Sequence, residues 1–369
     1  MRVWLQNPFD NLPSEGRRKQ RYWLMAEAFV AAGHEAVLWT SDFSHATKAP
    51  RQQTSAAPSQ GIAVRLVPTV PYAGNVSLAR VRSHADYARA WERLACAETA
   101  RPDLIVSSLP TISGAEAAAR LARRFGARLV VDVQDAWPET FERLAPRGLR
   151  WLAHLLLMPL RRRTRRVYRT ADLVTGVCDR YRTLVGRTDY LRAYLGIESP
   201  AAVRHLAHAG LSLVYAGNLG VSYDLKTIVA AVCADETLTL DVAGAGTFAC
   251  DCPRVRFHGL LDRKELADLF ARCDVGVIPM QDDSWVGVPN KLFDYAAAGL
   301  RIVSSLRGET EALLARHGLG VCYAAGDAAA LIRAVRAAVA LPARPLPDEL
   351  SASSIYRNYV DSVMKGLQS

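Results

Sequence analysis

Short apolar segments alternate with amphipathic segments along this chain, and the alternation runs through the sequence twice. In the first run, apolar segments such as MRVWLQNP and ARLVVDVQD are separated by stretches with helical spacing such as RYWLMAEAFVAAG. The pattern restarts at LSLVYAGNLG and continues to DVGVIPM. Apolar strands that alternate with helices form parallel sheets with helices on both faces. The sequence therefore predicts an α/β protein with two Rossmann-like domains.

The restart of the pattern sets the expected domain boundaries. We expect a first domain over residues 1–200 and a second over residues 201–350. Residues 351–369 have helical apolar spacing, and this helix either crosses back to the first domain or packs on the second alone. Glycines follow several predicted strands, and ligands of open parallel sheets bind at the carboxyl ends of strands. Neither a P-loop nor a complete GxGxxG fingerprint is present.

Composition narrows the class of protein. Half of the 369 residues are hydrophobic, which is enough for two large cores. The longest apolar run, Trp151–Leu160, is too short to span a bilayer. The amino terminus lacks the apolar core of a secretory signal, and an odd number of scattered cysteines, seven, is typical of reduced thiols. We therefore predict a cytoplasmic protein. Cys250 and Cys252 have no second closely spaced pair that would complete a zinc site.

The positive charge of the chain is concentrated in its first half. Residues 1–200 contain 30 Lys and Arg against 18 Asp and Glu, whereas residues 201–369 contain 16 against 18. Much of the excess lies in RGLRWLAHLLLMPLRRRTRRVYR, residues 147–169. A basic amphipathic helix of this kind suits an anionic membrane surface on the inner face of the cytoplasmic membrane. A solvated arginine-rich helix is the alternative. No signature of a nucleic-acid-binding fold accompanies the charge, so nucleic acid is not expected as a partner.

The segment GVPNKLFDYAAAG, Gly287–Gly299, predicts a short buried helix with a cationic entrance. Pro289 and Asn290 are residues that start helices, and Lys291 adds a full positive charge to the exposed N–H groups of the first turn. A phosphate would fit there. Asp294 would repel a phosphate, so it should accept hydrogen bonds, for example from ribose hydroxyls. The alternative interpretation is an ordinary capped core helix with a solvated lysine.

Seven blocks of sequence follow one another along the chain, and they include VVDVQDAWPET, YAGNLGVSYDLKTI, VAGAGTF and PNKLFDYAAAGLRIVSS. In this order the blocks resemble the bacterial family-four glycosyltransferases, and the similarity runs from Met1 to about Ala330. The nearest subgroup by these motifs builds cell-surface polysaccharides. The resemblance implies the GT-B fold, in which two Rossmann-like domains face each other across a cleft. It further implies that the first domain holds a glycan or lipid-linked acceptor and the second holds a nucleotide-diphosphate sugar.

The resemblance also implies roles for individual residues. Lys291 would neutralise the leaving diphosphate, Asp294 would contact the ribose, and Asp135 would position the acceptor hydroxyl or the reacting sugar. Lys291 and Asp135 are therefore the candidate catalytic residues, although a strand-end aspartate is also a common helix cap. The candidate donor-binding residues are Gly16, Gly217, Asn218, Gly244, Gly246, Pro289, Asn290, Lys291 and Asp294.

Family members retain the anomeric configuration and use no metal, and no Asp-x-Asp triplet is present here. The resemblance thus implies a transferase with no cofactor other than its donor substrate, in which Lys291, the helix dipole and loop N–H groups stabilise the departing diphosphate. Asp132 and Glu139 belong to the same acidic segment as Asp135, and Glu15 is a weaker candidate for an acceptor contact.

Two departures from the family pattern affect these expectations. Asn218 and Tyr223 replace a common Arg and Lys, and Val286 replaces the first of two glutamates. Asp282 and Asp283 lie nearby in the sequence as compensating carboxylates.

Two other functions stay open at this stage. The first is an epimerase of nucleotide sugars on the same fold, for which the acid and base groups are few. The second is a degenerate, non-catalytic homologue that docks on membranes. The sugar, the base and the acceptor are not identified by the sequence.

Overall fold

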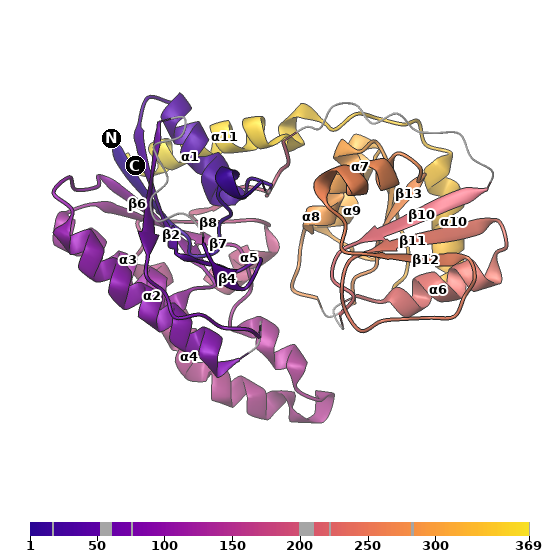
Figure 1. Cartoon of the computed structure of the whole chain (residues 1–369), viewed down its shortest axis with the longest axis horizontal. Helices are drawn as coiled ribbons and strands as arrows, with labels where there is room; N and C mark the ends of the chain where they lie inside the picture. The colour runs from indigo at the N-terminus through magenta and orange to yellow at the C-terminus, as the bar shows by residue number, and fades with distance from the viewer. Residues whose placement is uncertain are drawn as a thin grey trace. The chain divides into compact units, whose positions relative to one another are not determined.

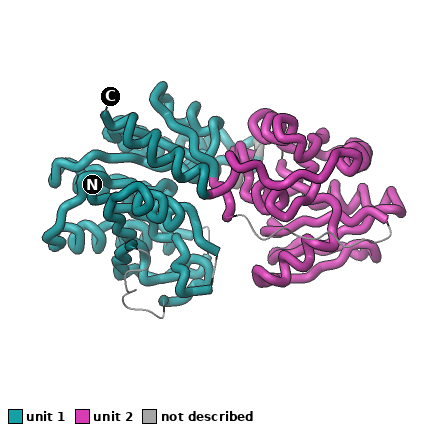
Figure 2. Tube along the Cα trace, turned by 90° about the horizontal axis from the view of Figure 1, so that it is seen from above, with its two compact units in different colours: residues 1–194, 353–369 teal, residues 195–352 magenta. Residues whose placement is uncertain are grey.

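The computed structural model describes residues 1–16, 18–51, 61–74, 77–198, 210–220, 223–281 and 284–368. The chain divides into two compact units (Figure 2). The first contains Met1–Tyr194 and Ser353–Ser369, and the second contains Leu195–Ala352.

The first unit is built on a parallel sheet. Among the described residues this sheet has seven strands in the order β5-β2-β1-β6-β7-β8-β9. The strands are β1 Arg2–Gln6, β2 Glu35–Ser41, β5 Ile62–Val67, β6 Leu104–Leu109, β7 Arg128–Val133, β8 Leu173–Gly176 and β9 Tyr190–Arg192. A small antiparallel hairpin, β3 Phe43–Ser44 and β4 Ala49–Pro50, follows β2.

Helices cover the first sheet, and α2, α3 and α4 run beside one another (Figure 1). The helices are α1 Arg21–Ala31, α2 Leu78–Ala97, α3 Ile112–Phe125, α4 Arg150–Thr170, α5 Arg180–Val185 and α11 Ala352–Gly366. Short 3₁₀ turns lie at Pro13–Glu15, Glu139–Leu144 and Arg147–Leu149. All of the strand pairs in this sheet are parallel, as the alternating pattern predicts.

A buried ion pair links the elements of the first unit. Arg21 on α1 donates to both carboxylate oxygens of Asp132 on β7, at 2.7 and 2.8 Å. The same guanidinium donates to the carbonyls of Ala193 and Tyr194. Its carbon lies 5.7 Å from the ring centroid of Tyr356 on α11. Because α1, β7, the segment after β9 and α11 all contact this one guanidinium, α11 is an integral part of the first unit.

The second unit repeats the architecture. Among the described residues its sheet has six strands in the order β12-β11-β10-β13-β14-β15, all parallel. The strands are β10 Leu211–Ala216, β11 Leu238–Ala243, β12 Val255–Gly259, β13 Val275–Ile278, β14 Arg301–Ser304 and β15 Gly320–Cys322. The helices are α6 Leu225–Ala234, α7 Arg263–Phe270, α8 Asn290–Ala297, α9 Glu309–His317 and α10 Ala328–Val339, and a 3₁₀ turn lies at Asp348–Leu350. The prediction of two Rossmann-like α/β domains is confirmed.

The register of the second sheet positions the loops that matter for binding. Ala216, the last residue of β10, pairs with Ala243, the last residue of β11. The two strands therefore end at the same level, and the glycine loops that follow them leave the sheet side by side.

Candidate functional site

Glycines allow the two loops of the second unit to touch. The N–H of Gly217 donates to the carbonyl of Ala243 at 2.8 Å, and a Cβ added to Gly244 would lie only 1.8 Å from the carbonyl oxygen of Gly217. Gly246 pairs with Leu219, and a Cβ there would lie 2.6 Å from the Leu219 Cβ. These contacts explain why glycine occupies each position: a side chain would push the loops apart.

The backbone N–H groups of Gly217 and Gly244 both donate hydrogen bonds within the second unit. Gly217 donates to Ala243, and Gly244 donates to the carbonyl of Gly259 at 2.7 Å. Neither N–H is therefore open to a diphosphate unless one of these hydrogen bonds breaks, and the expected contribution of loop N–H groups stays a prediction. The absence of a side chain at these two glycines instead leaves room for the Lys291 ammonium and for the close approach of the two loops.

Lys291 fills the space beside Gly217. A Cβ added to Gly217 would lie 2.3 Å from Lys291 Nζ. The ammonium lies 4.3 Å from the ring centroid of Tyr223 and 5.1 Å from that of Tyr215, which are cation–π distances. The lysine is only 9% exposed, and no carboxylate of the described residues forms an ion pair with it. Burial of a cation without a counter-ion is costly, so this position favours an anionic ligand.

Helix α8 carries the other predicted residues. Pro289 is its extended N-cap, Asn290 is its exposed first residue, and Asp294 is half-buried one turn further on. Asn218 is exposed on the loop after β10, where its carbonyl accepts a hydrogen bond from the Tyr215 hydroxyl at 2.5 Å. The structure thus brings Gly217, Gly244 and Lys291 into one place. Asn218 and Gly246 lie on the same two loops, and Asp294 lies on the helix that supplies the lysine.

Tyrosines that the sequence did not single out hold this site together. The Tyr295 hydroxyl accepts a hydrogen bond from the Ala216 N–H at 2.9 Å, and its ring lies against Gly276, where a Cβ would be 2.3 Å from the ring. Burial raises the pKa of Tyr295 above its usual range, so this hydroxyl stays protonated. The sequence signal that could have identified Tyr295 is its position directly after Asp294, in a segment already predicted to bind the donor.

The three acidic residues at the end of β7 and after it, Asp132, Asp135 and Glu139, do not form one group. Asp132 is fully buried in its pair with Arg21, and Glu139 lies 3.2 Å from the Nε of Arg161. Asp135 is half-buried. Burial raises its pKa, although hydrogen bonds and the nearby Arg80 oppose the shift. Asp135 is therefore the carboxylate of this segment left for binding or catalysis.

Two further predicted residues lie before α1. Gly16 has the left-handed conformation that ends the first 3₁₀ turn, with φ of 64°. The Glu15 carboxylate is tied to the Arg51 guanidinium and to the Leu12 N–H, so Glu15 fixes this loop. Asp282 and Asp283, the carboxylates expected to compensate for Val286, lie outside the described residues.

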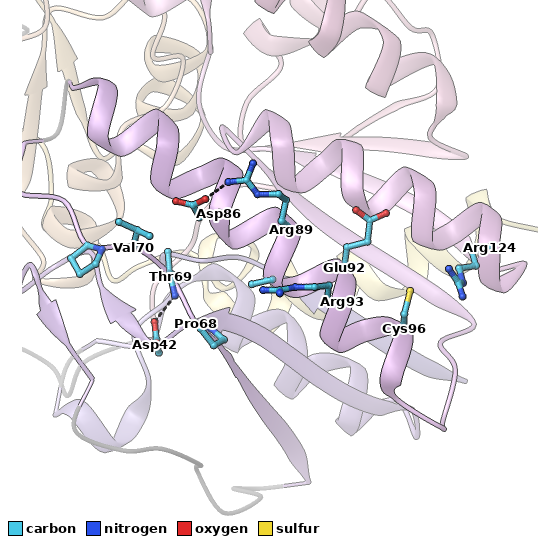
Figure 3. Close-up of a pocket in the computed structure, with 12 residues that line it drawn as sticks. Asp42, Pro68, Thr69, Val70, Asp86, Arg89, Glu92, Arg93, Cys96 and Arg124 are labelled. Atoms are coloured by element: carbon cyan, nitrogen blue, oxygen red, sulfur yellow. Dashed lines mark hydrogen bonds and ion pairs between the residues drawn. The ribbon is translucent and has the colours of Figure 1, made fainter.

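A groove of about 1130 Å³ lies elsewhere in the first unit, between α2 and the segment that follows β5 (Figure 3). Its walls include Asp42, which accepts a hydrogen bond from the Thr69 N–H, and Arg89, which pairs with Asp86. None of the predicted site residues lines it. Asp86 and Glu92 in its walls are paired with arginines, so we do not assign the groove a catalytic role.

Across the described ranges, no group of three or more His, Cys, Asp and Glu side chains is placed to hold a metal ion. Among the helices in those ranges, not one has both the length and the apolar character needed to cross a bilayer.

Two family models match the chain. Residues 20–194 match the glycosyl transferase 4-like domain, and residues 210–340 match the glycosyl transferases group 1 domain. No curated protein sequence matches the chain.

Three of the solved structures that share this fold illustrate the similarity. Sucrose-phosphate synthase from Thermosynechococcus elongatus has 14% identity and a TM-score of 0.67, with 99% of this chain and 94% of that one covered. HepE of Anabaena, solved with UDP and glucose, has 13% identity and a TM-score of 0.59, with 100% and 97% covered. The catalytic domain of starch synthase IV from Arabidopsis thaliana, bound to ADP and acarbose, has 10% identity and a TM-score of 0.64, with 100% and 99% covered.

Proposed function

Because this chain belongs to the glycosyltransferases with the GT-B fold, we propose that it transfers a sugar from a nucleotide-diphosphate sugar to a glycan or lipid-linked acceptor. The observation that carries the proposal is the buried ammonium of Lys291, which lies against Gly217 with no carboxylate of the described residues paired to it. We further propose retention of configuration and a role in the synthesis of surface polysaccharide.

In this proposal the second unit binds the donor. Departure of a nucleoside diphosphate develops negative charge, and Lys291 and the amino terminus of α8 stabilise that charge electrostatically. Tyr215 and Tyr223 hold the ammonium in position, so little reorganisation is needed when the charge appears. Asp294 accepts hydrogen bonds from the ribose. HepE and starch synthase IV were solved with UDP and ADP, which supports a nucleoside diphosphate as the ligand class.

The first unit supplies the acceptor side. The Asp135 carboxylate accepts a hydrogen bond from the acceptor hydroxyl. Its raised pKa makes it a better base for that proton than an ordinary aspartate. Gly16 stays a predicted donor-binding residue. The reaction uses no cofactor and no metal, because Lys291 takes the place of a divalent cation.

Nucleotide binding tests the donor site. Calorimetric titration of the pure protein with UDP, ADP, GDP and TDP should find at least one that binds, and Lys291→Met should weaken that one. Lys264→Met on α7 is a matched control, because it removes a lysine charge from the same unit outside the site. EDTA should leave both binding and transfer unchanged. The proposal fails if no nucleotide binds, or if Lys291→Met binds as the wild type does. Turnover of a nucleotide sugar to its epimer without acceptor would favour the epimerase instead.

The amphipathic helix α4 supports a lipid-linked acceptor. All four of its buried residues, Arg161, Thr164, Val167 and Tyr168, belong to its second half. Its first half exposes Trp151, Leu155 and Leu156, which are 64%, 51% and 71% exposed.

Two exposed arginines in the second half of α4 lie on the same face of the helix as these apolar residues. Residues that are four and seven apart share one face of a helix, so Trp151 and Leu155 align with Arg162 and Arg166. Each exposed arginine near an anionic bilayer contributes about 1 kcal/mol. We propose that this face rests on an anionic membrane at the cytoplasmic side.

Vesicle flotation tests the membrane contact. The protein should float with vesicles of phosphatidylcholine and phosphatidylglycerol, and less with phosphatidylcholine alone. Trp151→Ser with Leu155→Ser should abolish flotation, whereas Leu260→Ser, which changes an apolar residue 81% exposed in the other unit, should not. High salt should weaken the arginine contribution. Equal flotation of all variants would contradict the contact.

A further inference from the structure

Polar and aromatic side chains gather at the carboxyl ends of three strands of the first unit. Phe9 follows β1, Trp137 follows β7, and the turn of the β3–β4 hairpin after β2 contains His45 and Lys48. Arg80 on α2 reaches the same place. We call Phe9, His45, Lys48, Tyr72, Arg80, His84 and Trp137 the arginine cluster.

Arg80 lies among aromatic rings. Its guanidinium carbon is 4.9 Å from the ring centroid of Trp137, 5.3 Å from that of Phe9 and 5.9 Å from that of Tyr72. Its Nε donates to His84 Nε2 at 3.3 Å. Burial and the nearby positive charge of Arg80 lower the pKa of His84 to about 3, so this imidazole is neutral and can accept that hydrogen bond.

Lys48 brings a second cation to the cluster. Its Nζ lies 2.9 Å from His45 Nδ1 and 4.7 Å from the ring centroid of Tyr72. Burial, Lys48 and Arg80 lower the pKa of His45 to about 4, so His45 is also neutral. Lys48 has a positive φ of 57°, the one such non-glycine residue among those described. A left-handed conformation is strained for a residue with a side chain, and backbone strain of this kind concentrates at ligand sites.

The balance of charge in the cluster favours an anion. Two basic side chains, Arg80 and Lys48, stand beside two imidazoles that stay neutral at pH 7, and burial lowers the pKa of both basic groups. Asp135 is the carboxylate that acts on Arg80, and burial raises its pKa. Phe9, Lys48, Arg80 and Trp137 are each half-buried, so a ligand can reach them from solvent. Their rings offer flat apolar surface next to the charge.

We propose that the arginine cluster binds an anionic group of the acceptor, a phosphate or a carboxylate, through Arg80 and Lys48. Phe9 and Trp137 form apolar walls around the neighbouring part of the acceptor. The inference rests on the proposed function, because it assigns the cluster to the acceptor of the transfer. A lipid-linked acceptor would supply a phosphate, and an acidic glycan would supply a carboxylate.

Ligand-detected NMR with the full chain tests this inference. The probes are methyl glucuronide and citronellyl phosphate, with methyl glucoside as the neutral counterpart. Arg80→Gln and Lys48→Gln should weaken binding of at least one anionic probe about tenfold or more, the loss expected for a charge-assisted hydrogen bond. Binding of methyl glucoside should not change. The anionic probe that responds identifies the group.

Two control variants separate this inference from the donor site. Arg89→Gln removes an exposed arginine of the same helix, paired with Asp86, and should bind the probes as the wild type does. Lys291→Met should also bind them normally, and Arg80→Gln should still bind nucleoside diphosphate. Equal wild-type affinity for charged and neutral probes, or unaltered anion binding by both Arg80→Gln and Lys48→Gln, would overturn the inference. If Arg80→Gln does not fold, Lys48→Gln alone tests the inference, because Lys48 is half-buried in the turn of the β3–β4 hairpin.

Discussion

Replacing Gly217 by alanine should displace the lysine of the donor site without touching the lysine itself. The new Cβ would lie 2.3 Å from Nζ and 2.8 Å from Cε of Lys291, whereas ordinary contact begins at 3.4 Å, so the side chain must retreat by about 1 Å. A charge-assisted hydrogen bond contributes about 1.5–3 kcal/mol. Its loss corresponds to about a 10- to 150-fold weaker affinity for nucleoside diphosphate.

A double-mutant cycle with calorimetry and urea unfolding measures this displacement. Lys291→Ala removes Nζ and Cε, so Gly217→Ala should destabilise the Lys291→Ala protein less than it destabilises the wild type. The double variant should bind no more weakly than Lys291→Ala alone. Gly326→Ala is the control, because Gly326 has a φ of 77° with no atom within 4 Å of an added Cβ. Wild-type affinity in Gly217→Ala would refute the assignment of Lys291 to the diphosphate.

Three further outcomes are expected. Arg21→Met leaves the carboxylate of Asp132 buried without its partner and should lower the free energy of unfolding by about 3–5 kcal/mol, measured by urea with tryptophan fluorescence; a loss below about 1 kcal/mol would contradict the structural role. His84 has a folded pKa of about 3, below the ordinary 6.5, so the unfolded chain takes up the proton first and stability falls as the pH drops below 6.5. By pH 5 this loss is about 2 kcal/mol, and His84→Gln should remove that part of the pH dependence of urea unfolding. Asp294→Asn should weaken binding of nucleoside diphosphate about tenfold while leaving pyrophosphate binding unchanged, and equal losses for both ligands would exclude a ribose contact.

The regular elements were predictable because their periodicity is local. The predicted helix at Gly287–Gly299 is observed as Asn290–Ala297, and the predicted helix in RYWLMAEAFVAAG is observed as Arg21–Ala31. The β3–β4 hairpin was not predicted, since strands of two residues have no period to detect.

The contacts of the site were less accessible from the sequence. Gly217 and Lys291 are far apart in the chain, and they meet only because the fold of the second unit brings the loop after β10 to the first turn of α8. Tyr215 was not predicted as a site residue, because a buried aromatic in a strand gives no sign that a cation lies over its ring. Gly217 and Gly244 were predicted to lie at the donor site, but the sequence does not show that their amides donate to Ala243 and Gly259.

The path of the chain has a consequence for folding. The second unit is inserted into the first, because the chain leaves the first unit after Tyr194 and returns to it at Ser353. The ribosome therefore makes the whole second unit before it makes α11, whose tyrosines complete the pocket around Arg21. We therefore expect the second unit to fold during synthesis before the first is complete. Until α11 is made, the ion pair of Arg21 and Asp132 lacks the tyrosines that bury it. A fragment that ends before α11 should consequently accumulate as a folded second unit attached to an aggregation-prone first one.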